Sequence, residues 1–254
     1  MKKIPDGYQN EFLIVLEFNN KKVKELNPML REVIDDLFPN IDEDKIVKSW
    51  RNHINNQKGD ILLKIDKKIK SISIKKRSRN SVHVENIEAF KKYLKESGIK
   101  DKIIYDYELF HYGVDRFNNK KILSSSEFSK KYKRKIRRIN KAFSKISRES
   151  VTDRFLLCGN NSMYRIDGII YGTPNDFLWI NKNEVLKIIE KTNNLNSKTI
   201  HIGPLYVQPF NRCINNNKKY LWCRDFVQIK WYSLYDDIIK HKNEIVMETR
   251  KKYF

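Results

Sequence analysis

The sequence predicts an α/β fold, in which a mixed central β-sheet is flanked by helices. One segment, residues 60–76, repeats its apolar and polar side chains with the period of two that β-strands have. Other segments, residues 28–37, 84–97 and 128–143, place apolar residues at the three- and four-residue steps of helices. Hydrophobic residues make up 40% of the 254 residues, which is enough for a packed core.

Two helices are expected before the first strand. Residues 7–10 form the start of a helix that continues to Glu17. Asn27 then caps a second helix, and Pro28 occupies the first helical position, where its missing N–H costs nothing. The apolar residues of this second helix fall on one face: Leu30, Val33, Ile34 and Leu37.

A β-hairpin follows. Residues 60–66 form its first strand, a turn at 66–68 reverses the chain, and residues 69–76 form the second strand. Ser73 and Lys75 are two positions apart, so their side chains share one face of that strand.

The later elements are a helix at 84–97 and a basic amphipathic helix within 119–150. They are followed by strands at 154–158 and 164–171, a helix at 184–191, and strands at 200–207 and 226–231. We expect residues 1–115 to form a catalytic core that contains the hairpin, with the hairpin at one edge of the sheet. Residues 116–254 are expected to form a recognition part that packs with this core as one globular unit.

The charge balance points to a polyanionic partner. There are 52 Lys and Arg residues against 31 Asp and Glu residues, which gives a formal net charge of +21. Nucleic acid is the commonest partner of so basic a chain, although a low-GC genome also enriches Lys. Charge alone does not separate DNA from RNA. The densest basic stretch, residues 130–138, lies on the predicted amphipathic helix.

Two classes of protein are excluded by composition. No run of about 18 apolar residues is present, which argues against a membrane protein. The three cysteines, Cys158, Cys213 and Cys223, form no CxxC pair and no disulfide framework. A reducing, cytoplasmic location is expected, because the N-terminus also lacks the apolar region of a signal peptide.

The hairpin carries the strongest chemical pattern. It should bring Asp60 close to Ser73 and Lys75, which gathers a carboxylate, a hydroxyl and an ammonium group. Such a set suits hydrolysis of a phosphodiester, with Asp60 and Ser73 as oxygen ligands of Mg²⁺ and Lys75 acting on the attacking water. An alternative is the Gln228-x-Lys230 pair, with Asp176 as its acid, but 52 residues separate Asp176 from Gln228.

Several other residues are candidates for nucleic-acid contact. Gln208 and Arg212 carry side chains that can read adenine and guanine edges. The remaining candidates are basic side chains expected to contact phosphates or to lie near DNA: Lys76, Arg77, Arg79, Lys133, Arg134, Arg137, Arg138 and Lys230.

Asp60, Ser73 and Lys75 together resemble the PD-(D/E)xK nuclease superfamily, although Ser73 stands where the second acid usually stands. The order of the C-terminal segments, residues 200–212 and then 226–231, is similar to small MspI-like type II restriction endonucleases. In those enzymes an amide residue can replace the second acid. The resemblance also makes Glu11 a candidate metal ligand, because superfamily members often place a helical glutamate beside the metal.

The resemblance implies a restriction-endonuclease-like core and a Mg²⁺-dependent endonuclease. Its substrate would be double-stranded DNA containing a short palindrome, within a restriction-modification system, and such a site is compatible with binding by a homodimer. Two other functions stay open at this point. Ser73 can mark a degenerate nuclease that only binds DNA, and the charge is equally compatible with an RNA-binding or RNA-processing protein.

Overall fold

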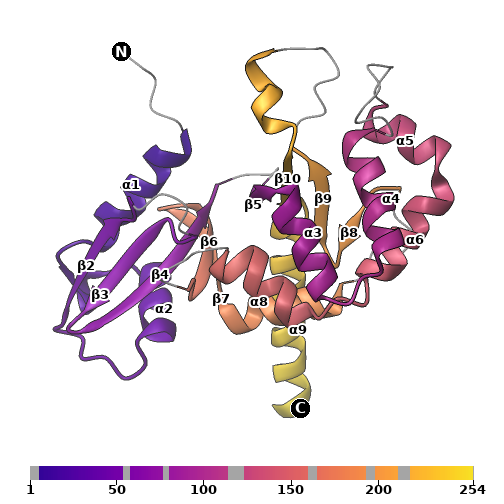
Figure 1. The fold of residues 1–254 in the computed structure, drawn as a ribbon. Coiled ribbons are helices and arrows are strands. Elements are labelled where there is room, and N and C mark those ends of the chain that lie inside the picture. Colours follow the sequence, from indigo (N-terminus) through magenta and orange to yellow (C-terminus); the bar gives the residue numbers. More distant parts are fainter. Residues whose placement is uncertain are drawn as a thin grey trace. The chain divides into compact units, whose positions relative to one another are not determined.

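The computed structural model has the predicted α/β class, with a mixed β-sheet and flanking helices (Figure 1). The chain divides into two compact units, each built from segments that are distant in sequence. Unit 1 comprises Met1–Ser78, Thr152–Ile188 and Leu234–Phe254, and unit 2 comprises Arg79–Val151 and Ile189–Ser233. The structure describes residues 6–53, 58–76, 80–113, 123–159, 165–192, 198–210 and 218–253.

Unit 1 contains a six-stranded mixed sheet in the order β1-β2-β3-β4-β6-β7. Its strands are β1 (Lys21–Lys22), β2 (Ile46–Arg51), β3 (Ile61–Ile65), β4 (Lys68–Lys75), β6 (Gly168–Thr173) and β7 (Asp176–Asn181). Strands β4 and β6 run parallel, while the other neighbours are antiparallel. The predicted hairpin is β3–β4, and it lies in the middle of the sheet and not at its edge, because β6 pairs with the side of β4 that faces away from β3 (Figure 1).

The turn of this hairpin is shorter than the sequence suggested. Ile65 pairs directly with Lys68, so Asp66 and Lys67 alone connect the strands. Asp66 adopts a φ of 52°, a left-handed conformation that Asp tolerates better than most residues. Ile61, Leu63, Ile72 and Ile74 bury their side chains in one core, so Asp60, Ser73 and Lys75 belong to the opposite alternation of the pleat.

Helices cover the sheet of unit 1. α1 (Asp6–Phe18) packs on β2, and Asn27 caps α2 (Pro28–Leu37) by accepting a 2.9 Å hydrogen bond from the Leu30 backbone N–H. Apolar residues of α1 and α2 share the core with the strands. A short 3-10 helix, Val23–Glu25, lies between β1 and α2 in the sequence. Three helices come later in the chain: α7 (Arg148–Thr152), α8 (Lys182–Lys191) and α9 (Leu234–Tyr253).

Unit 2 contains a four-stranded antiparallel sheet in the order β5-β10-β9-β8. Its strands are β5 (Asn80–Asn86), β8 (His201–Ile202), β9 (Leu205–Pro209) and β10 (Phe226–Trp231). Its helices are α3 (Ile87–Glu96), α4 (Asp101–Tyr112), α5 (Ser125–Lys131) and α6 (Lys133–Phe143), with a 3-10 helix at Lys218–Cys223. The core of the helices is aromatic, since Phe90, Tyr107 and Phe143 pack with ring centroids 5.1 to 6.3 Å apart.

Three further sequence predictions differ from the structure. Residues 154–158 were expected to be a strand but lie in a π-helix, Asp153–Cys158, because the apolar run Phe155–Leu157 is equally compatible with a buried helix. The segment 200–207 is a hairpin and not one strand, since Gly203 turns the chain at a φ of 59°. The predicted helix 84–97 begins at Ile87, because residues up to Asn86 pair with β10 as β5.

The two units also do not follow the division at residues 115 and 116. β6 and β7, which come late in the chain, pair next to β4 and so belong to unit 1.

Within the described part of the chain, no helix has the length and apolar character needed to cross a membrane.

Candidate active site

Asp60 lies immediately before β3 and is held by backbone bonds on both sides. Its N–H donates to the Ile72 carbonyl at 2.9 Å, and its carbonyl accepts from the Asn52 N–H at 3.0 Å. The preceding residue, Gly59, passes so close to β4 that an added Cβ would lie 1.9 Å from the Ser71 hydroxyl. A side chain at this position would force the Ser71 hydroxyl to move.

The Asp60 carboxylate is the centre of the predicted cluster. Its Oδ2 accepts hydrogen bonds from the Ser73 hydroxyl at 2.9 Å and from the Ile74 backbone N–H at 2.6 Å. The Lys75 ammonium lies 3.5 Å from the same oxygen. The structure thus brings Asp60, Ser73 and Lys75 together, as the hairpin register predicts. Their catalytic and metal-binding roles stay predictions.

Glu11, on α1, lies within electrostatic reach of this cluster. Burial raises the pKa of Glu11 above its usual value, and the negative charge of Asp60 raises the pKa further. Arg51, at the end of β2, opposes this shift because its Nε donates to Glu11 Oε2 at 3.0 Å. The Arg51 guanidinium also lies over the Tyr8 ring, 4.7 Å from its centroid.

Sequence reasoning missed the supporting residues of this site. Arg51 carried a weak signal, as a basic residue at the end of a strand that was not predicted. Asn10 donates from Nδ2 to the Gly172 carbonyl of β6 at 2.9 Å, and the Ser49 hydroxyl of β2 donates to the Val15 carbonyl of α1 at 2.7 Å. These bonds, at Asn10 and at Val15, hold the part of α1 that contains Glu11 against two strands of the sheet.

The two carboxylates carry the kind of oxygen atom that Mg²⁺ takes as a ligand. Asp60 Oδ1 and Glu11 Oε1 have no hydrogen-bond partner among the described residues, and the two like charges repel. Mg²⁺ is usually held by one or two carboxylates and keeps several waters, so two such oxygens are sufficient. No group of three or more His, Cys, Asp or Glu side chains suited to a metal occurs in the ranges that the structure describes. Carboxylate oxygens are hard ligands, so these two suit a hydrated Mg²⁺ better than Zn²⁺.

The predicted phosphate-contacting residues have different surroundings. Lys133, Arg134 and Arg137 are exposed on α6. Arg138, in contrast, forms an ion pair with Asp106 of α4, and Lys135 lies 2.5 Å from the same carboxylate. Arg138 is also exposed, but its guanidinium is occupied by this ion pair, which makes it a weaker candidate for DNA contact than its neighbours.

Asp106 is almost completely buried, and burial alone would raise its pKa. Hydrogen bonds and charge from the two cations outweigh this effect and hold the pKa below its usual value. Asp106 therefore stays ionised and keeps Lys135 and Arg138 in place.

The C-terminal candidates lie in unit 2. Gln208 donates from Nε2 to Gln228 Oε1 at 2.8 Å, across neighbouring strands β9 and β10. The Lys230 ammonium lies 5.5 Å from the centroid of the Tyr232 ring. Asp176 belongs to β7 of the other sheet, so it is not a strand partner of Gln228 and Lys230. Lys76 is partly buried after β4, while Arg77, Arg79 and Arg212 fall outside the described residues.

Comparison with known proteins finds a likeness of structure but none of sequence. No protein-family model and no curated protein sequence matches the chain. Among solved structures, the chain is similar to the restriction endonuclease MspI in complex with its cognate DNA. The likeness covers 88% of this chain and 87% of that one, with 13% sequence identity and a TM-score of 0.44.

Proposed function

We propose that the protein is a Mg²⁺-dependent endonuclease that cleaves double-stranded DNA. The observation that carries this proposal is that Ser73 and Lys75 both contact one carboxylate oxygen of Asp60. Glu11 is close enough for the charge of Asp60 to raise its pKa. A carboxylate pair beside a lysine is a suitable constellation for phosphodiester hydrolysis.

Each residue has a distinct role in the proposal. Asp60 Oδ1 and Glu11 Oε1 would hold Mg²⁺, which supplies Lewis-acid charge to the phosphoryl oxygen when bound. Ser73 donates to Asp60 Oδ2 and so orients the carboxylate, leaving at most a weak or water-mediated contact to the cation. Lys75 lies beside Asp60 and offsets negative charge that develops in the transition state, or orients the attacking water.

The choice of substrate rests on charge. A net charge of +21 favours a polyanion, and the exposed lysine and arginine residues of α6 provide phosphate contacts. Cleavage at a short palindrome, as in a restriction-modification system, and binding as a homodimer follow from the resemblance of the sequence to MspI-like enzymes and belong to the same proposal.

Plasmid digestion tests the proposal directly. The purified protein should cut supercoiled plasmid in Mg²⁺ and not in EDTA, and sequencing of the ends should give one short symmetric site. The Asp60→Asn variant should be inactive under the same conditions. The wild-type protein should be tested in Mg²⁺ and in Mn²⁺, on unmethylated DNA of varied sequence. If it cuts none of this DNA, the enzymatic assignment is contradicted.

A catalytically degenerate DNA-binding protein is the second candidate. It is favoured by Ser73, whose hydroxyl provides no charge where a second carboxylate is usual and is already bonded to Asp60. This candidate predicts duplex binding without cutting in either metal. An RNA-directed function predicts instead that a hairpin RNA displaces duplex DNA at equal nucleotide concentration. Plasmid digestion and this competition assay together separate the three functions.

A further inference from the structure

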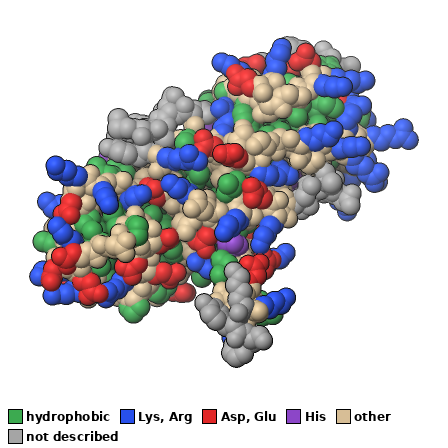
Figure 2. Space-filling view, turned by 90° about the horizontal axis from the view of Figure 1, so that it is seen from below, with side chains coloured by type: hydrophobic (Ala, Val, Ile, Leu, Met, Phe, Trp, Pro, Cys, Tyr) green, Lys and Arg blue, Asp and Glu red, His purple; other side chains and the backbone are tan. Residues whose placement is uncertain are grey.

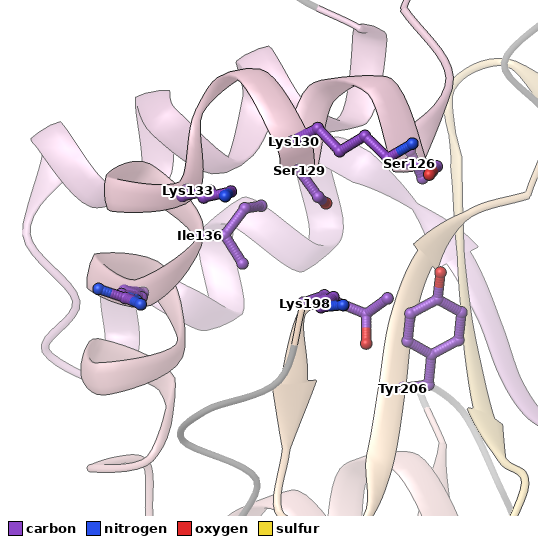
Figure 3. Close-up of a pocket in the computed structure, with 10 residues that line it drawn as sticks. Ser126, Ser129, Lys130, Lys133, Ile136, Lys198 and Tyr206 are labelled. Atoms are coloured by element: carbon purple, nitrogen blue, oxygen red, sulfur yellow. The ribbon is translucent and has the colours of Figure 1, made fainter.

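A pocket of about 970 Å³ lies in unit 2, separate from the carboxylates of the candidate active site. Helices α5 and α6 form one wall, and the segment that begins at Lys198 and continues through β8 and β9 forms the other (Figure 3). The residues that line it are Ser125, Ser126, Ser129, Lys130, Lys133, Ile136, Arg137, Lys198, Thr199 and Tyr206.

The lining is cationic from both walls. Lys130, Lys133 and Arg137 come from the helices, and Lys198 comes from the strand side. None of the four pairs with a carboxylate among the described residues, and the lining contains no Asp or Glu. Elsewhere charges of both signs are mixed, as the face shown in Figure 2 illustrates. The pocket therefore gathers four positive charges with no carboxylate in its lining to balance them.

Hydroxyl groups accompany these cations. The Ser129 hydroxyl lies buried against the pocket and has no hydrogen-bond partner in the described part of the chain (Figure 3). A buried hydroxyl without a partner destabilises the fold, so an acceptor oxygen that reaches it is favoured. Ammonium, guanidinium and hydroxyl donors together are the groups that bind phosphate oxygens.

The apolar part of the pocket does not favour recognition of a base. Tyr206 lies between His201 of β8 and Tyr232 beyond β10, with ring centroids 5.4 and 5.5 Å away. Its ring is thus already packed against aromatic neighbours and is a poor stacking platform. Burial lowers the pKa of His201 to about 4, so this neighbour adds no charge at neutral pH.

We infer that this pocket binds the phosphate backbone of the nucleic acid that the protein cleaves, through two or more phosphates and without reading the bases. The inference rests on the proposed function, because it takes a polynucleotide as the substrate. The pocket would hold the strand through its backbone and so contribute affinity but not chemistry.

A matched pair of double variants tests the inference. Lys130→Ala/Lys133→Ala removes two cations from the helical wall. Lys102→Ala/Lys145→Ala removes the same charge from exposed positions in the same unit that do not line the pocket. Duplex binding is measured by fluorescence anisotropy over a salt series, in Ca²⁺ to prevent cleavage, and thermal melting verifies that both variants fold.

The pocket variant should lower the slope of log K against log salt by about 2, because each lost phosphate contact removes about 0.9. The control variant should change the slope by less than half as much. Lys198→Ala, from the opposite wall, should lower it by about 1. Equal slopes in the pocket and control variants would overturn the inference, even if the wild-type protein still cuts DNA.

Three further outcomes are informative. Wild-type binding without cutting, together with the expected loss of slope, would refute the nuclease proposal and leave the pocket assignment standing. Failure of the wild-type protein to bind duplex DNA would refute both. Pyrophosphate and ATP should bind only weakly at 1 mM. Tight binding of either one, abolished by the pocket variant, would overturn the inference by making a small phosphate compound the ligand.

Discussion

Replacement of Asp60 by Asn is the most direct test of the site, because it removes one charge and keeps the shape of the side chain. In the structure, one oxygen of Asp60 is bound to the Ser73 hydroxyl, the Ile74 N–H and the Lys75 ammonium. The oxygen of an Asn side chain can still accept from the first two groups. The local fold of the hairpin should therefore survive while the anionic centre of the site is lost.

The expected magnitudes differ between stability and activity. A hydrogen bond to a charged group contributes roughly 1 kcal/mol more than a neutral one, and Asp60 is partly exposed, so we expect a stability loss of about 1 to 2 kcal/mol. Loss of metal assistance costs several kcal/mol in the transition state, and about 4 kcal/mol corresponds to a rate decrease of about 10³-fold. Duplex affinity should be unchanged or tighter, since a negative charge is removed.

The assay combines single-turnover cleavage in Mg²⁺, anisotropy in Ca²⁺ and thermal melting. Asp66→Asn is the matched control, because Asp66 lies at the other end of the same hairpin, is exposed, and pairs with Lys45. The control should keep wild-type cleavage. If Asp60→Asn cleaves within tenfold of wild type, the metal-binding role of Asp60 is refuted.

Three other predictions follow from the same geometry. Lys75→Ala should abolish cleavage at saturating enzyme and leave DNA affinity nearly unchanged. Lys230→Ala should instead weaken DNA binding, and its cleavage should recover at saturating enzyme. The reverse pattern in single-turnover kinetics would move the active site to unit 2. The affinity for Mn²⁺ should fall as the pH decreases through the raised pKa of Glu11, because protonation removes the charge of a metal ligand. In the Glu11→Gln variant, a Mn²⁺ titration should no longer show this pH dependence. Asp106→Asn should lower the free energy of unfolding by about 2 kcal/mol at pH 7. The stabilisation by Asp106 is fully present above the pKa of this residue in the unfolded chain, and it is lost as the pH falls through the lowered pKa of the folded protein. Melting curves of the variant and the wild type should therefore converge in acid.

Local patterns in the sequence were sufficient for the hairpin and for its chemical cluster. Alternation of side chains along β4 places Ser73 and Lys75 on one face, and a tight turn necessarily brings Asp60 opposite them. The capped helix at Pro28–Leu37 and the strand Phe226–Trp231 were predicted for the same reason. Their signals arise from residues within one element or one turn, where geometry is nearly independent of the rest of the chain.

Long-range pairing decided what the sequence did not determine. Parallel addition of β6, nearly a hundred residues later, places β3–β4 in the middle of the sheet and divides the chain into units that no local pattern marks. Arg51 joins Glu11 only because α1 packs on β2, and the basic pocket exists only because α5 and α6 face the segment that contains Lys198 and Tyr206. Such contacts join residues far apart in sequence, so they depend on how amphipathic faces pack and not on the periodicity of any single element.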